Sequence, residues 1–318
     1  MANSNAVQPT CDRVYVNHHL DSRRWQHVRL RPDDIVISTS YKAGTTWMQR
    51  IVSLLIFGPG PLPAPLGFLS PWIDARFFPF PIEQIIAGIE AQQHRRFLKS
   101  HLPLDALPFD ERVKYIYVGR DGRDVFMSLF NHYSADTDLA FQQFNSGADF
   151  AGEPLPRCPQ DIHQLFDGWV HRASFPWEQD GWPMWSHLYH AQSFWKHRQQ
   201  PNIHFVHYAD LKADLEGEMR RIAAFLGITI IERDWPALVE KATFESMKRE
   251  AVDNDDLLTP VFEGGARRFY FKGTNGRWHD VLMPAELVEY DKAVARSLSP
   301  DCAAWLERGR LEMRLHPR

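Results

Sequence analysis

A short β-branched run that leads through a glycine-containing loop into a helix constrains the fold of this chain more than any other feature. Asp34–Ser38 (DIVIS) is typical of a buried strand, and the apolar residues of Trp47–Phe57 recur at helical spacing. Between them lies the tight loop Lys42–Trp47 (KAGTTW). A strand, a loop and a helix in this order indicate the first unit of an α/β fold.

Three further short runs predict the other strands of the sheet, namely Arg96–Lys99, Val113–Val118 and Ile203–Tyr208. His101 lies just beyond the first of these runs, and Arg120 lies just beyond the second. Open parallel sheets bind ligands at the carboxyl ends of their strands. We therefore expect a binding site where these polar residues follow the strands.

Helices are predicted between and after the strands. Asp124–Tyr133 is expected as a helix capped by its first residue, Asp210–Leu226 carries an apolar helical stripe, and another helix should start after Pro284. Residues 134–190 have weak periodicity and many Phe and Trp, which predicts an irregular aromatic-rich substrate lobe. Residues 1–318 are thus predicted to form a P-loop-like single α/β domain with a central parallel sheet flanked by helices.

Composition limits the classes of function. The 318 residues include 36 Lys and Arg against 40 Asp and Glu, a net charge of −4, which does not favour nucleic acid as a partner. Cys11, Cys158 and Cys302 are far apart, which argues against disulfides and zinc sites and suits a cytoplasmic location. The apolar run at residues 51–57 is too short for a membrane span, and the N-terminus shows no secretory signal.

The loop after the first strand has the chemistry of a phosphate site. Gly44 permits close backbone approach at a helix N-terminus, Thr45 and Thr46 add hydroxyl donors, and Lys42 adds a positive charge. The alternative is an ordinary turn with a solvated lysine. The common nucleotide P-loop places its lysine after the second glycine, whereas here the lysine precedes the only one. A nucleotide kinase or ATPase is therefore less favoured.

Two more motifs carry candidate chemistry. Lys99 and His101 lie two residues apart, on the same side of an extended chain, where the histidine could act as a general base. Arg120 and Ser128 could hold a second phosphate through the guanidinium and the hydroxyl group. The alternatives are a structural histidine and a salt-bridged surface turn.

In this order, the motifs resemble the PAPS-dependent cytosolic-type sulfotransferase family, in a bacterial-like form, where PAPS is 3′-phosphoadenosine 5′-phosphosulfate. Ser40–Trp47 is similar to the family's loop for the 5′-phosphosulfate, Phe97–Leu104 to its catalytic-histidine strand and Tyr117–Tyr133 to its 3′-phosphate segment. The resemblance spans most of the chain. It continues through three later segments: Phe205–Leu211, Ala242–Met247 and Phe269–Trp278.

The resemblance implies a transferase that moves a sulfuryl group from PAPS to the hydroxyl of a small acceptor, without a required metal. His101 would be the general base, Lys42 would stabilise the leaving phosphate, and Lys99 and Ser128 would assist. The implied nucleotide contacts are Lys42, Ala43, Gly44, Thr45, Thr46, Trp47, Arg120, Ser128, Tyr208, Thr243, Phe244, Lys272 and Gly273.

The chain departs from the family pattern at several positions. Tyr41 stands where the family usually has Pro, and Ala43 where it often has Ser. Phe271 replaces an arginine that grips the 3′-phosphate, and Arg277 replaces an aspartate. The missing charge could come from one of three nearby arginines: Arg267, Arg268 or Arg277. A catalytically inactive homologue that binds 3′-phosphonucleotides therefore remains an alternative, besides a P-loop nucleotide kinase.

Aromatic residues indicate the class of acceptor. The segment Phe68–Phe80 and the Trp-rich lobe could form an apolar pocket for an aromatic or lipid-like alcohol, or could simply pack the core. The lobe tryptophans are Trp169, Trp177, Trp182 and Trp185. A homodimer is possible, but no dimer motif is evident.

Overall fold

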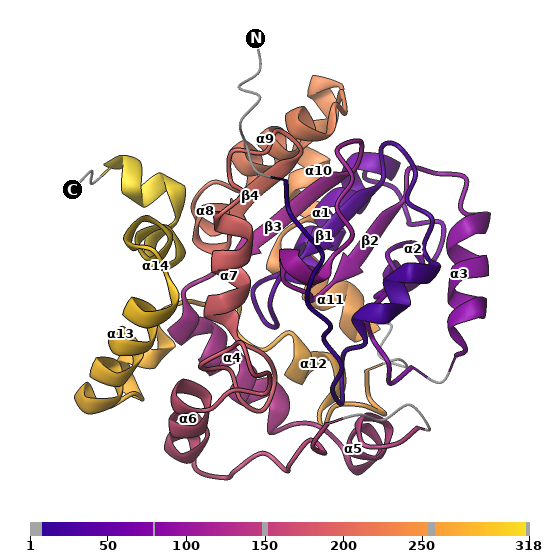
Figure 1. Ribbon diagram of the computed structural model, residues 1–318. Helices are drawn as coiled ribbons and strands as arrows, with labels where there is room; N and C mark the ends of the chain where they lie inside the picture. Colours follow the sequence, from indigo (N-terminus) through magenta and orange to yellow (C-terminus); the bar gives the residue numbers. More distant parts are fainter. Residues whose placement is uncertain (1–7, 79, 148–151, 254–257, 316–318) are drawn as a thin grey trace.

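The centre of the protein is a sheet of four parallel strands in the order β2-β1-β3-β4 (Figure 1). The computed structural model describes residues 8–78, 80–147, 152–253 and 258–315. The strands are β1 (Ile35–Ser38), β2 (Phe97–Ser100), β3 (Lys114–Gly119) and β4 (Ile203–His207). This confirms the predicted parallel sheet, and each strand agrees with its predicted bounds to within one residue at either end.

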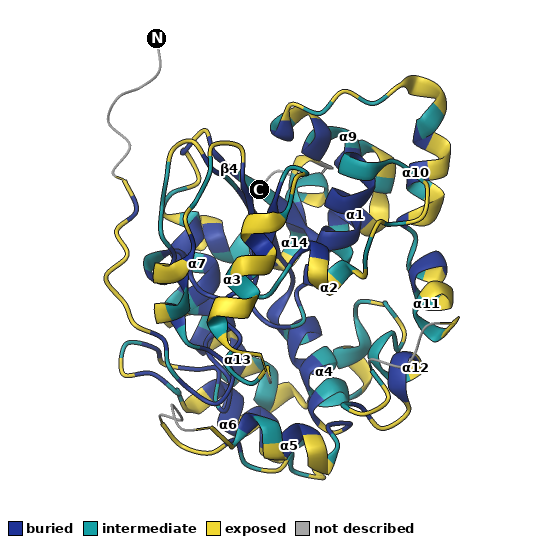
Figure 2. Cartoon of the chain, turned by 90° about the vertical axis from the view of Figure 1, so that its right-hand side faces the viewer, coloured by how far each residue is buried: buried dark blue, intermediate teal, exposed yellow. Residues whose placement is uncertain are grey.

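Helices surround the sheet on both faces, and the exposed residues of these helices lie on their outer sides (Figures 1 and 2). The α-helices are α1 (Thr45–Phe57), α2 (Leu66–Leu69), α3 (Ile82–Ala91), α4 (Gly122–Tyr133), α5 (Asp138–Phe144), α6 (Ile162–His171), α7 (His187–Trp195), α8 (Tyr208–Ala213), α9 (Leu215–Leu226), α10 (Trp235–Lys241), α11 (Phe244–Asp253), α12 (Gly265–Phe269), α13 (Pro284–Ser297) and α14 (Pro300–Leu315). Short 3₁₀ helices are η1 (Ser22–His27), η2 (Leu104–Ala106), η3 (Glu232–Asp234) and η5 (Arg277–Asp280).

Alternate residues of the central strand β1 enter two different apolar clusters. Ile35 and Ile37 pack with side chains of α1, α9 and α10 on one face of the sheet. Val36 packs with side chains of α4, α7, α13 and α14 on the other face. A strand covered on both faces is apolar along its whole length, which explains the unbroken run of apolar residues in the sequence.

The predicted helix over Asp210–Leu226 is wrong in one respect, because two helices occupy this stretch. Asp214 lies between α8 and α9 with φ −148° and ψ 77°, and its carboxylate accepts a hydrogen bond from the Gly217 N–H at 2.9 Å. An aspartate that caps a helix through its side chain takes a non-helical backbone conformation. The apolar stripe is therefore real, but the helix restarts in its middle.

The predicted cap of α4 is also wrong. The helix begins at Gly122, and the carboxylate of Asp121 accepts from the Arg123 N–H at 2.8 Å. Asp124 instead accepts a hydrogen bond from the Gly276 N–H at 2.7 Å. The second aspartate thus ties α4 to a C-terminal segment that is distant in the sequence.

The region predicted as an irregular lobe contains α5, α6 and the start of α7, joined by long connections. Residues 148–151 of this region, and residue 79 of the aromatic segment before it, lie outside the described residues. Phe141, Phe144, Phe166 and Trp169 are buried in the cluster that also covers the sheet. The aromatic residues of the lobe therefore serve partly as core.

The C-terminal helix α14 closes against the ends of β3 and β4. A Cβ atom on Gly119 would lie 2.5 Å from the Trp305 ring, so only glycine allows this contact. The Nε2 of His207 donates to the Leu306 carbonyl at 2.9 Å. The Arg310 N–H donates to the Asp210 carboxylate at 2.9 Å. Helix α14 thus completes the scaffold beneath the strand ends.

A buried ion pair holds the opposite ends of β1 and β2. Asp34 and Arg96 directly precede these strands, and their side chains are 2% and 1% exposed. Arg96 donates from Nε to Oδ1 of Asp34 at 2.8 Å and from Nη2 to Oδ2 at 2.5 Å. A bidentate pair of this kind fixes the relative position of the two chains.

Replacement of Arg96 by alanine should lower the free energy of unfolding by about 3–5 kcal/mol, because it leaves the Asp34 carboxylate buried without its partner. Urea unfolding measures this loss. The control is Arg112→Ala, which removes an exposed partner of Asp110 and should change stability little. Equal effects of the two substitutions would contradict the structural role of the buried pair.

Candidate active site

Three parallel strands deliver the candidate residues to one edge of the sheet. Ser38 at the end of β1 is paired with Ser100 of β2 on one side and with Tyr117 of β3 on the other. The loop after β1, His101 after β2 and Arg120 after β3 therefore emerge side by side. The motifs that are separated in the sequence lie together at the carboxyl edge.

The loop after β1 turns sharply into α1. Lys42 has φ 58° and Gly44 has φ 115°, both in the left-handed region, and Gly44 is the N-cap of α1. A Cβ on Gly44 would lie 3.0 Å from the Tyr208 ring, so its approach to this ring also favours glycine. Thr45 and Thr46 form the first turn of α1. This helix N-terminus can bind an anion through its N–H groups.

The ring of His101 is held in one tautomer. Its Nδ1 lies 2.8 Å from the Thr39 carbonyl oxygen, and a carbonyl only accepts, so Nδ1 carries the proton. The lone pair therefore lies on Nε2. The backbone N–H of His101 donates to Asp74 at 3.0 Å, and the same carboxylate oxygen accepts from the Trp72 indole at 2.7 Å. Asp74 thus positions both the histidine and the aromatic ring beside it.

Electrostatics keep the His101 imidazole neutral. Burial, together with the neighbouring Lys99 ammonium, holds the pKa of His101 well below its ordinary value of 6.5. Burial also lowers the pKa of Lys99 to about 8. The Lys99 Nζ lies 4.2 Å from the centre of the Trp72 ring. A neutral imidazole with a free Nε2 can accept a proton at neutral pH.

Lys42 lies among other cations. Its Nζ lies 2.9 Å from Nδ1 of His132 and 4.9 Å from the centre of the Phe269 ring. Burial, followed by the positive charges of Arg120 and Lys99, lowers the pKa of Lys42 to about 7. A bound anion would favour the charged form of this lysine.

Arg120 connects the loop to the C-terminal segment. It donates to the Lys42 carbonyl at 3.1 Å and to Oδ1 of Asn275 at 3.0 Å, and it lies 4.1 Å from the centre of the Tyr208 ring. Ser128 lies half-buried on α4. Both residues come from the segment that begins at the end of β3.

Aromatic rings form a separate wall beside the loop. Trp47 donates from its indole to the Ala242 carbonyl at 2.7 Å and packs edge-on against Tyr208 at 5.2 Å between centroids. Gly273 lies directly against Phe244, since a Cβ there would be 2.8 Å from the ring. These residues can enclose a flat aromatic group.

Two other predicted contacts lie at the margin of this wall. Thr243 accepts a hydrogen bond from the Ser246 N–H at 3.2 Å at the start of α11. Lys272 is exposed, with its Nζ 5.3 Å from the centre of the Phe271 ring. Ala43, in the loop after β1, is fully buried.

The three arginines that could replace the missing charge differ in position. Arg267 is exposed, and Arg268 donates to the hydroxyl of Ser134 at 3.0 Å. Burial and the charge of Arg120 lower the pKa of Arg277. Its Nε is buried and has no hydrogen-bond partner among the described residues. Of the three, Arg277 is the one that shares the surroundings of Arg120.

A wall of aromatic rings packs beside His101. Trp72 packs edge-on against the His101 ring at 4.7 Å, and Trp185 lies 5.8 Å away. Phe77 packs on Trp72 at 5.3 Å and on Phe144 at 4.8 Å. An apolar acceptor group could lie along this wall, which comes from both predicted aromatic regions.

The other lobe tryptophans lie elsewhere. Trp169 is buried and donates to the Tyr41 hydroxyl at 2.7 Å, so it supports the loop residue that replaces proline. Trp182 packs under the Arg172 guanidinium at 4.0 Å. Trp177 lines a different cavity. Of the four lobe tryptophans, these three therefore do not contact His101 in the described structure.

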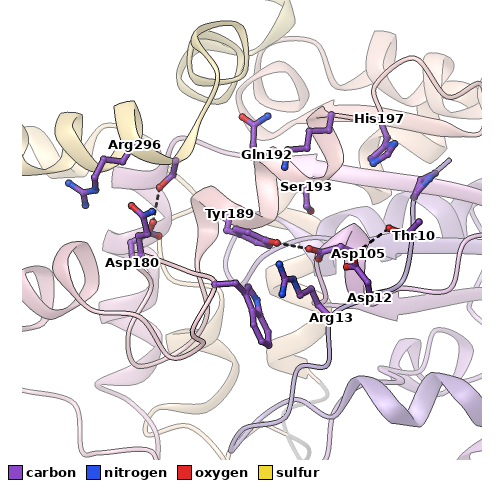
Figure 3. A pocket seen from close by; sticks show the side chains of 15 residues that line it. Thr10, Asp12, Arg13, Asp105, Asp180, Tyr189, Gln192, Ser193, His197 and Arg296 are labelled. Carbon is purple, nitrogen blue, oxygen red and sulfur yellow. Dashed lines mark hydrogen bonds between the residues drawn. The ribbon is translucent and has the colours of Figure 1, made fainter. Parts of the chain in front are cut away.

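That cavity, of about 410 Å³, lies on the outer side of α7 and contains none of the predicted site residues (Figure 3). Tyr189 donates to Asp105 at 2.5 Å within it. Its walls are Pro9, Thr10, Asp12, Arg13, Asp105, Trp177, Gln179, Asp180, Tyr189, Gln192, Ser193, Lys196, His197, Arg296 and Ser297. Within the described ranges, no group of three or more His, Cys, Asp or Glu side chains is arranged to hold a metal ion.

Sequence reasoning missed three residues that contact the site. Asp74 orients His101, His132 contacts Lys42, and His187 contacts the loop before Lys42. Asp74 and His187 belong to no recognisable motif, His132 lies at the end of the segment that resembles the family's 3′-phosphate segment, and each is far in sequence from its partner. Their only local signal is a polar residue placed among apolar ones, which is not specific.

The fold and this arrangement are typical of α/β proteins that bind phosphate groups at the carboxyl edge of a parallel sheet. The sequence profile of the sulfotransferase domain matches residues 32–300. The chain therefore belongs to the sulfotransferase family, a family of transferase enzymes, as the sequence motifs predicted.

Two relatives and one solved structure of similar fold illustrate the similarity. A glycolipid sulfotransferase of Mycobacterium bovis is 35% identical, over 96% of this chain and 98% of the relative. Sulfotransferase 1A1 of Rattus norvegicus is 28% identical, over 85% of this chain and 86% of the relative. The crystal structure of retinol dehydratase in complex with androsterone and the inactive cofactor PAP has a TM-score of 0.65 at 21% identity, and the match covers 87% of this chain and 84% of that one.

Among the described residues, no helix is both long and apolar enough to cross a membrane.

A charge change next to His101 should move its pKa. Because the Lys99 ammonium disfavours a second positive charge nearby, Lys99→Met should raise the pKa of His101 toward 6.5. An NMR titration of the histidine ring carbons, assigned with His101→Gln, measures the shift. The exposed Lys196→Met variant is the control and should leave this pKa unchanged. A fall in the pKa of His101 in the Lys99 variant would contradict the arrangement.

Proposed function

We propose that this protein transfers a sulfuryl group from PAPS to a hydroxyl group on a small acceptor with an apolar body. One observation carries the proposal: the charges of Arg120 and Lys99 act on Lys42, the charge of Arg120 acts on Arg277, and none of these four cations forms an ion pair with a carboxylate in the described part of the chain. Unpaired cations of this kind suit a ligand with several negative groups. PAPS offers a 3′-phosphate, a 5′-phosphate and a sulfate.

The nucleotide would be held at two phosphate positions. The N–H groups of Gly44, Thr45 and Thr46, with Ala43 in the preceding turn, would bind the 5′-phosphate at the start of α1. Arg120 and the hydroxyl of Ser128 would bind the 3′-phosphate. The buried, unpaired Nε of Arg277 supports a role for this residue in place of the arginine missing at position 271.

The adenine would lie in the aromatic wall beside the loop. Trp47 and Phe244 would contact its faces and Tyr208 its edge. Thr243, Lys272 and Gly273 would border it. Gly273 lies directly against Phe244, Thr243 precedes Phe244 in the chain, and Lys272 lies beside the Phe271 ring. A flat base is enclosed here at little conformational cost, since the rings are already packed.

The residues around His101 would carry the transfer. Nε2 of His101 would take the proton from the acceptor hydroxyl as its oxygen forms a bond to sulfur. The bond between sulfur and the bridging phosphate oxygen breaks, and Lys42 would stabilise the negative charge that remains on the nucleotide. Lys99 would stabilise charge on the sulfuryl oxygens. PAPS supplies the sulfuryl group, and the chain supplies positioning and charge.

The acceptor would place its apolar part against Trp72, Phe77 and Trp185. A glycolipid is the acceptor in the name of the Mycobacterium relative, and such a molecule combines hydroxyl groups with a long apolar part. We therefore favour a lipid-like alcohol. In this proposal residues 1–318 act as a single domain, and residues 134–190 cover the acceptor.

The first experiment is a calorimetric titration with 3′-phosphoadenosine 5′-phosphate (PAP) and with 5′-AMP. PAP should bind more tightly than AMP, because only PAP reaches Arg120 and Ser128. The same protein should sulfate a lipid-like alcohol with PAPS, and His101→Ala should lower turnover by about 100-fold with nearly unchanged PAP affinity.

Equal binding of the two nucleotides would contradict the donor assignment. Preference for PAP without turnover of any acceptor would favour the inactive homologue, for which the phenylalanine at position 271 provides a reason. Full turnover by His101→Ala would exclude the histidine as the base.

Arg277 provides a separate prediction. Arg277→Ala should weaken PAP binding by about tenfold or more but leave AMP binding nearly unchanged, since it removes a charge from the 3′-phosphate side. The exposed Arg267→Ala is the matched control and should bind both nucleotides as the wild type does. A similar loss in both variants would indicate a general effect of charge.

A further inference from the structure

One buried histidine contacts both phosphate-binding segments. His187, the first residue of α7, is 0% exposed. Its Nδ1 lies 2.5 Å from the hydroxyl of Ser40, in the loop after β1, and its Nε2 lies 2.9 Å from the carbonyl oxygen of Arg120, after β3. A single side chain therefore joins the loop of the 5′-phosphate to the residue proposed for the 3′-phosphate.

The direction of both hydrogen bonds follows from their partners. A carbonyl oxygen can only accept, so Nε2 of His187 carries the proton and donates to Arg120. Nδ1 is then an acceptor, and the hydroxyl of Ser40 donates to it. Burial lowers the pKa of His187 to about 4, so the ring stays in this neutral form at neutral pH. Only one tautomer satisfies both contacts.

The side chain of Arg120 makes a second link back to the same loop. Its Nη1 donates to the Lys42 carbonyl at 3.1 Å. Residues 40–42 are thus connected to Arg120 twice, through the imidazole of His187 and through the guanidinium. A shift of either segment would strain one of these hydrogen bonds, so the spacing of the two segments is fixed.

The position of the histidine is itself fixed by the start of α7. Ser186 caps the helix by accepting from the Tyr189 N–H at 2.9 Å, and it donates to Asp180 at 2.5 Å. The outer side of α7, with Tyr189 and Gln192, borders the cavity of Figure 3. The inner side carries His187. The histidine is therefore held by the helix cap and by its two hydrogen bonds.

We propose that His187 is a positioning residue that sets the distance between the 5′-phosphate loop and Arg120, and so makes the site selective for nucleotides with both phosphates. This inference rests on the proposed function, because it uses the nucleotide contacts assigned there. His187 itself touches neither phosphate. It acts by holding Ser40 and the backbone of Arg120.

The two nitrogen atoms can be tested separately. The side chain of Asn can reproduce the acceptor at Nδ1, and that of Gln can reproduce the donor at Nε2. His187→Gln should lose the hydrogen bond to Ser40 and lower the affinity for PAP and for AMP alike, by about tenfold. His187→Asn should lose the link to Arg120 and reduce the preference for PAP over AMP by about tenfold. Calorimetric titrations with both nucleotides measure these values.

His190→Gln is the matched control. This histidine is also fully buried on α7, but its Nε2 lies 3.4 Å from Ser38 and it has no hydrogen bond to Ser40 or Arg120 in the described structure. It should lower thermal stability without changing the preference for PAP. If the His187 variants match this control in affinity and preference, the inference is wrong.

Ser40→Ala keeps the test decisive where a variant of the buried histidine unfolds. It should weaken the binding of both nucleotides as His187→Gln does. The variant that combines Ser40→Ala with His187→Gln should lose no more affinity than either single variant. If the losses of affinity in the two single variants add up in the combined variant, or if Ser40→Ala loses no affinity, the inference is wrong. The wild-type preference for PAP is the reference: its absence would refute the proposed function, and the inference with it.

Discussion

The parallel register of β1 with its two neighbours is the constraint on which the rest of the structure depends. Because Ser38 is level with Ser100 and Tyr117, the chain leaves all three strands at one edge. A slip of one residue would turn the side chains to the opposite face and separate the loop from His101. The buried pair of Asp34 and Arg96 fixes this register from the other end of the sheet. The relative positions of the site residues therefore depend on an ion pair at the opposite edge of the sheet.

This site brings the side chains of Lys42 and Lys99 together in a buried environment, where a charged group is energetically unfavourable. The pKa values of Lys42 and Lys99 are lowered because both ammonium groups are partly removed from water, and the imidazole of His101 stays neutral for the same reason. An anionic nucleotide would relieve this cost when it binds, so that part of its affinity comes from the fold itself. The same charges that disfavour the empty state would favour the developing negative charge during transfer.

The sequence could predict the features that depend on residues close together in the chain. The strands, the loop at Lys42 and the residues after each strand are contiguous patterns, and the structure places them as expected. It could not predict the break at Asp214, where a side-chain cap competes with a helix that has a continuous apolar stripe. Nor could it predict His187, whose two partners lie 147 and 67 residues away. Contacts of this kind depend on how helices pack, which no short pattern encodes.

The contact of Gly119 with Trp305 has a consequence for the order in which the protein forms. Helix α14 occupies the space that a side chain at the end of β3 would otherwise fill. Its backbone also forms hydrogen bonds with the side chains of His207 and Asp210. These contacts come from residues synthesised almost two hundred positions after β3. The strands and the loop can be made early, but a nascent chain lacks the support beneath its nucleotide edge until α14 has been synthesised. The chain therefore gains its full capacity to bind a nucleotide only after α14 has been made.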